Sequence, residues 1–139
     1  MNQASFSTLH YIFAAVGLVL TFASCEERPN SKMVKTQQEI MIKKVILILG
    51  LIVEDEGSPP KTLDPIVTME NIQPEDAPHY LNYFDPITNK RAPWDYFPEN
   101  WGLHDKLVLT APFVYEMNGE SRRLVAWGDR KVEWILSGK

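Results

Sequence analysis

Residues 36–53 read TQQEIMIKKVILILGLIV, and this stretch decides the fold. Its length and its straight-chain residues predict a helix. Six apolar side chains recur at helical spacing and predict a face turned toward the core: Ile42, Val45, Ile46, Leu49, Ile52 and Val53. Leu47, Ile48 and Leu51 lie off that face. Wherever these three are exposed in the folded chain, we expect them to mark a surface for a partner.

The end of this helix is marked by the sequence EDEG at residues 54–57, with two prolines at residues 59–60. Gly57 can take the left-handed conformation after the last turn, and the prolines prevent the helix from continuing. The alternative is a membrane segment, since two lysines precede an apolar run at residues 45–53. That run is far shorter than the roughly 20 residues that span a bilayer, so the pattern favours a buried helix.

The last third of the chain has the alternation typical of antiparallel strands. Residues 112–117 lead into an Asn-Gly pair at 118–119, a strong hairpin signal. Residues 122–127 run back, a Gly-Asp pair at 128–129 supplies a second turn, and residues 131–136 return. The sequence therefore predicts an α+β fold, with one long N-terminal helix packed on a small C-terminal antiparallel sheet.

Between the helix and these strands, residues 68–107 form a segment rich in proline and aromatic residues. It is predicted to be irregular but packed, with one short strand at residues 80–84. Trp94, Tyr96 and Trp101 lie close together in it and are the candidate binding residues. Exposed, they would form a platform for sugar rings or a partner protein; buried, they would build the core, which is the commoner arrangement in small domains.

The first 25 residues contain no charged side chain and form a separate compositional block. Residues 11–22 (YIFAAVGLVLTF) match the apolar core of a secretory signal peptide. The sequence FASC at residues 22–25 follows, and it resembles the lipobox of bacterial lipoproteins. That resemblance implies a signal peptide at 1–24 and lipid on Cys25, a diacylglyceryl group on the sulfur and an acyl chain such as palmitate on the amine.

A lipidated Cys25 would anchor the exported domain to a membrane of the bacterial cell envelope, because several acyl chains hold a protein stably where one does not. The alternative is ordinary secretion, since the small residues before Cys25 also suit a signal peptidase. The polar residues 25–35 are predicted to be a tether, and residues 36–139 a single domain.

Composition excludes several classes of function. The net charge of −4 offers no basic excess for nucleic acid. One cysteine and three histidines without metal-site spacing predict no metal, no disulfide and no cofactor. No nucleophile elbow or phosphate loop is present, so we expect no enzyme. A paired acid–base site could be built only from the loop carboxylates, which are Asp85, Asp95, Glu99 and Asp105.

Two segments resemble the type II secretion pseudopilins and related prepilin-like proteins. Residues 54–63 (EDEGSPPKTL) are similar to the helix-to-loop junction of that family, and residues 124–134 (LVAWGDRKVEW) to its closing hairpin. The resemblance covers roughly residues 33–136 and implies a pseudopilin-like fold. The family starts with a prepilin cleavage site and a membrane-spanning helix, whereas this chain has the lipobox-like sequence at residues 22–25. The calcium ligands of the pseudopilins have no residue-by-residue match in this chain, so no calcium site is assigned.

Two functions follow as expectations. The first is a non-catalytic, lipid-anchored envelope protein whose domain contacts other envelope proteins, including secretion or pilus-type machinery. The second is a ligand-binding module that uses Trp94, Tyr96 and Trp101 to hold a glycan or peptide.

Overall fold

The computed structural model describes residues 31–69 and 71–138, which belong to one compact unit. It opens with helix α2, Ser31–Glu56. The helix begins five residues before the predicted start, so residues 31–35 are helical and the assignment of these residues to the tether was wrong. Val34 and Gln38 explain the extension, because both are buried and continue the core face of the helix toward its N-terminus at a spacing of four.

The predicted core face of α2 is confirmed for five of its six residues, and the sixth, Val53, is half-buried. Ile42, Val45 and Leu49 are fully buried, and the helix stops after Glu56, as the sequence indicates. Gly57 follows with a φ of 81°, and its N–H donates to the carbonyl of Val53 at 2.8 Å, which closes the last turn. Within the described residues, α2 included, no helix has the length and apolar character needed to cross a bilayer.

Short elements follow α2 before the main sheet begins. They are the 3-10 helix η1 (Asp64–Thr68), helix α3 (Ala77–Leu81) and the antiparallel hairpin of β1 (Asn82–Asp85) and β2 (Lys90–Pro93). The strand expected at residues 80–84 is thus present, shifted toward the C-terminus because α3 occupies Tyr80 and Leu81.

The main sheet has five antiparallel strands arranged around β6. They are β3 (Asp95–Tyr96), β4 (Leu107–Thr110), β5 (Tyr115–Met117), β6 (Glu120–Trp127) and β7 (Val132–Leu136), with a 3-10 turn η2 (Pro98–Asn100) between β3 and β4. Strands β4 and β5 pair with successive parts of one edge of β6, and β7 covers the other edge. The predicted meander of β5, β6 and β7 is confirmed, whereas β3 and β4 were not predicted.

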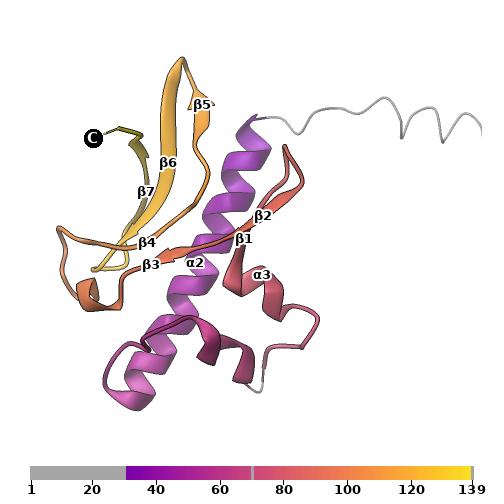
Figure 1. Cartoon of the computed structure of the whole chain (residues 1–139). Coiled ribbons are helices and arrows are strands. Elements are labelled where there is room, and N and C mark those ends of the chain that lie inside the picture. The colour runs from indigo at the N-terminus through magenta and orange to yellow at the C-terminus, as the bar shows by residue number, and fades with distance from the viewer. Residues whose placement is uncertain (1–30, 70, 139) are drawn as a thin grey trace, which may run out of the picture. The chain divides into compact units, whose positions relative to one another are not determined.

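The core lies between α2 and the sheet, so the α+β prediction is confirmed (Figure 1). Leu109, Leu124 and Ala126 from the sheet are fully buried in the same cluster as the core face of α2. Two polar contacts fix the helix in place. Trp134 Nε1 donates to Glu39 Oε1 at 2.9 Å, and Gln38 Nε2 donates to the carbonyl of Phe84 at 3.1 Å.

Candidate functional site

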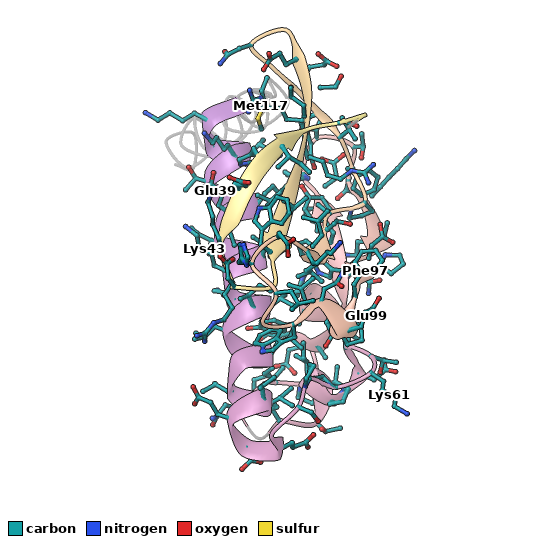
Figure 2. All side chains as sticks on the ribbon, turned by 90° about the vertical axis from the view of Figure 1, so that its left-hand side faces the viewer. Glu39, Lys43, Lys61, Phe97, Glu99 and Met117 are labelled. Atoms are coloured by element: carbon teal, nitrogen blue, oxygen red, sulfur yellow. The ribbon has the colours of Figure 1, made fainter. Side chains whose placement is uncertain are left out.

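The side of α2 that faces away from the core carries exposed apolar residues. Ile40, Leu47 and Leu51 are 50%, 64% and 48% exposed, and we call these three the outward face. They lie on one line because seven and eleven residues are about two and three turns of helix. Figure 2 shows α2 along one side of the domain, with the sheet and loops on its other side. Leu47 and Leu51 are thus exposed, while Ile48 is only partly so.

Charged residues flank the outward face in two groups of opposite sign. Lys43 and Lys44 lie beside its middle, and Glu54 and Asp55 lie at its C-terminal end; all four are exposed. In the part of the chain that the structure describes, none of them forms an ion pair. Their charges are therefore available to a partner that docks on the outward face.

A groove runs beside the outward face, between α2 and residues 69 and 71–80. It consists of two neighbouring hollows of about 380 and 260 Å³ that share Lys44 and Tyr80. The wall opposite the helix includes Met69 and Ile72, which pack partly buried against the core. The smaller hollow widens the apolar surface that begins at Leu47 and Leu51, whereas the larger one is bordered by polar side chains that include Gln37, Asp76 and His79.

The aromatic segment is divided between the core and the surface. Trp94 is only 5% exposed and stands edge-on to Tyr83, with ring centroids 5.1 Å apart. Tyr96 is half-buried and borders the same hollow of about 430 Å³ as Trp94. Trp101 is half-buried and borders a different hollow, beside Arg130. The structure thus brings Trp94 and Tyr96 together and sets Trp101 apart, and the three rings do not form an exposed platform.

Tyr96 serves as a tie between β3 and the chain after α2. Its hydroxyl donates to the carbonyl of Pro60 at 2.7 Å, and burial, with a smaller contribution from Glu99, raises its pKa to about 12. We expect Tyr96→Phe to lower the free energy of unfolding by about 1 kcal/mol, since one hydrogen bond is lost. Urea denaturation at neutral pH measures this change.

The pKa of Tyr96 can be checked with the same variant. In the folded protein, the tyrosinate absorbance that Tyr96→Phe removes is expected to develop near pH 12 rather than near pH 10. Because the pKa is raised on folding, the stabilisation by Tyr96 is complete below about pH 10 and declines as the pH rises toward 12. Ionisation of this residue near pH 10 in folded protein would show that the hydroxyl is not held in this way.

A buried polar network lies at the end of β1. The sequence analysis named Asp85 as a loop carboxylate but did not predict its connection to Tyr115 and, through it, to Tyr83. Asp85, 3% exposed, accepts a hydrogen bond from the Tyr115 hydroxyl at 2.9 Å, and the Tyr83 hydroxyl donates to that of Tyr115 at 2.6 Å. The backbone N–H groups of Ile87 and Thr88 and the Thr88 hydroxyl also donate to Asp85. The signal was the local sequence DPIT at residues 85–88, in which an aspartate accepts hydrogen bonds from the turn that follows it.

The network fixes the ionisation states of its members. Burial favours the neutral form of Asp85, but the hydrogen bonds from Thr88, Tyr115 and the backbone outweigh it, so the pKa of Asp85 lies below its ordinary value. Burial also raises the pKa of Tyr83 and of Tyr115. Asp85 is thus a carboxylate whose oxygens are occupied by protein donors, which suits a structural role.

The other residues that the sequence analysis considered for a metal or acid–base site do not come together in the described part of the chain. Among residues 31–69 and 71–138, no three His, Cys, Asp or Glu side chains are placed to hold a metal ion. Asp95 accepts a long hydrogen bond from the Thr110 hydroxyl at 3.4 Å, and both Glu99 and Asp105 are exposed. Cys25, the predicted lipidation site, lies outside the described residues.

Comparison with known proteins identifies no relative, since no family model, curated protein or solved structure matches the chain.

Proposed function

We propose that this chain is a non-catalytic, lipid-anchored protein of the bacterial cell envelope whose domain binds other proteins through the outward face of α2. The observation that carries the proposal is the exposure of Ile40, Leu47 and Leu51 on one line of a helix whose opposite face is fully packed. The core does not need these side chains. Exposed apolar side chains aligned on one side of a helix beside a groove are typical of a protein interaction surface.

The anchor is supported by the sequence at residues 11–25, an apolar run that ends in FASC. Because α2 begins at Ser31, only residues 25–30 connect the lipidated Cys25 to the helix. Six residues span at most about 20 Å when fully extended. The start of α2 would therefore be held close to the membrane surface, which brings membrane-associated proteins within reach of the domain.

The class of partner follows from the resemblance to pseudopilins at residues 54–63 and 124–134, which favours secretion or pilus-type machinery. The alternative, a glycan or peptide site on the aromatic segment, loses its support because Trp94 is a core residue and Trp101 lies at a different hollow from Tyr96.

The anchor is tested by the intact mass of the protein from the membrane fraction. We expect the mass of residues 25–139 plus acyl groups, and we expect Cys25→Ala to lose both the added mass and the membrane attachment. An unmodified chain that is released in soluble form would contradict the anchor and leave ordinary secretion as the explanation.

The interaction surface is tested by placing a photo-crosslinking amino acid at Leu47 in the membrane-bound protein. We expect crosslinked species from this position. The matched control is the same amino acid at Glu99, which lies on the side of the domain away from α2 (Figure 2) and is also exposed. Equal crosslinking from both positions, or none from Leu47, would contradict the assignment of this surface.

A further inference from the structure

We propose that the C-terminal part of the outward face of α2, Leu47 and Leu51, binds the same residues of a second copy of this chain, with the two helices antiparallel. The inference rests on the proposed function, since it names the partner of that surface. The spacing of the exposed leucines and the positions of the neighbouring charges support it.

The apolar residues define a seam on the exposed side of the helix. Met33, Ile40 and Leu47 are spaced by seven residues, and so are Lys44 and Leu51, which lie four residues after Ile40 and Leu47. This alternation of four and three is the spacing with which two helices pack side by side. Met33, like the outward face, is exposed. Because α2 ends at Glu56, an antiparallel pair centred at Leu49 overlaps over residues 42–56, so Leu47 and Leu51 are the seam residues that it buries.

The charges select the orientation and the register. A two-fold axis at the level of Leu49 places Leu47 of one copy against Leu51 of the other. The same register brings Lys43 next to Glu54 of the second copy on the side of the Leu47 row, and Lys44 next to Asp55 on the side of the Leu51 row. Residues eleven apart are about three turns apart, so each lysine and its acidic counterpart lie on the same flank.

Two-fold symmetry repeats each contact, so one register joins four opposite-charge pairs around a leucine centre. Other arrangements lack this match. A parallel pair in register sets Lys44 beside Lys44, and an antiparallel pair centred near Lys44 also brings the lysines together. Like charges that face each other across a helix seam oppose association, and the charges therefore act as a specificity element.

The arrangement is compatible with the proposed anchors. The two helices start at opposite ends of an antiparallel pair, so the pair would lie along the membrane surface with one anchor at each end. Residues 25–30 are short enough to hold it there.

The first test uses two tagged copies produced together in the cell envelope, one with Lys43→Cys and the other with Glu54→Cys. Under mild oxidation we expect a disulfide between the two different tags, because these positions face each other only in the proposed register. Each variant produced alone is the matched control and should stay uncrosslinked, since residues 43 and 43, or 54 and 54, lie about ten residues or more out of register. The unsubstituted chain shows whether Cys25 itself forms a disulfide.

The second test exchanges the charges. Reversal of both lysines, Lys43→Glu with Lys44→Glu, is expected to reduce co-purification of two tagged copies in mild detergent roughly tenfold or more, because four attractive pairs become repulsive. Adding Glu54→Lys and Asp55→Lys to the same chain should restore pairing with itself. The double reversal Lys61→Glu with Lys106→Glu, at two exposed positions outside α2, controls for the change of net charge.

The outcomes separate this inference from the proposed function. A mixed disulfide together with charge rescue supports the antiparallel pair. Disulfides within each single variant, or loss without rescue, would overturn the register. If Leu47 crosslinks to a different envelope protein and no mixed disulfide forms, the self-association is wrong and the interaction surface stands. If Leu47 crosslinks to nothing and no disulfide forms, both are wrong.

Discussion

Replacing Gly128 with alanine is expected to lower the free energy of unfolding by about 3 kcal/mol or more, enough to unfold much of a marginally stable domain. A Cβ atom at Gly128 would lie 2.0 Å from the carbonyl oxygen of Asn100 and 2.4 Å from that of Leu103. Both are backbone atoms, so no side-chain rotation relieves the overlap.

The surrounding hydrogen bonds prevent the loop from moving aside. Gly128 N–H donates to the carbonyl of Lys106 at 2.8 Å, and its own carbonyl accepts from Gly102 N–H at 2.9 Å. Displacing residues 100–106 would break both bonds and also disturb Asn100, whose side chain donates to the carbonyl of Leu107 at 2.6 Å. The substitution therefore lowers the free energy of unfolding whether the overlap remains or the loop moves aside.

Gly119→Ala is the matched control. Gly119 has a φ of 77°, but a Cβ there meets nothing within 4 Å. Its substitution carries only the backbone cost of about 1 kcal/mol. Chemical denaturation followed by tryptophan fluorescence measures both variants. If Gly128→Ala were no more destabilising than Gly119→Ala, that result would contradict the close packing of residues 100–106 against Gly128.

Asp85→Ala is expected to have the second largest effect, a loss of about 3 kcal/mol. The substitution removes the acceptor of the Tyr115 hydroxyl and of the backbone N–H groups of Ile87 and Thr88. Groups that lose their partners in a buried site retain the full cost of leaving water. Asp85→Asn keeps one oxygen acceptor and should be less destabilising than Asp85→Ala.

The pH dependence of stability gives an independent test of Asp85. Its pKa is lower in the folded than in the unfolded chain, so the unfolded state binds more protons between the two values. The stabilisation by the carboxylate is therefore complete above the unfolded pKa of about 4 and is lost as the pH falls through the folded pKa.

The measurement compares the wild-type protein with Asp85→Asn from neutral pH to pH 3. The difference in free energy of unfolding should be constant above about pH 5 and shrink below pH 4. Glu133, whose pKa is also lowered, by hydrogen bonds from Lys131 and Trp127, is present in both proteins and cancels. A difference that is unchanged at low pH would show that the charge of Asp85 does not stabilise the fold.

The aromatic segment shows why the candidate site was only partly accessible to sequence reasoning. Proximity in the sequence placed Trp94, Tyr96 and Trp101 in one group. Which of them is buried depends on Tyr83, from the preceding hairpin, whose ring packs against Trp94, and on the carbonyl of Pro60, to which Tyr96 donates. Neither neighbour is specified by the spacing of the aromatic residues themselves.

The sequence by itself determined the elements that follow from local geometry. The period of 3.6 residues gave α2 its core face and left Leu47 and Leu51 outside it, and Gly57 with the two prolines set the end of the helix. The alternation and the Asn-Gly turn determined the pairing of β5 with β6. These features depend on backbone conformations that each short segment prefers without contacts from elsewhere in the chain.

Only the tertiary structure decided the features that depend on contacts between distant residues. Strand β4 has four residues and no alternation, and it is a strand because β6 supplies its hydrogen bonds. The space at Gly128 is taken by residues 100–106, and the burial of Asp85 is completed by Tyr115. The physical reason is that packing across the fold brings together residues that are far apart in the sequence, and no local sequence pattern predicts such contacts.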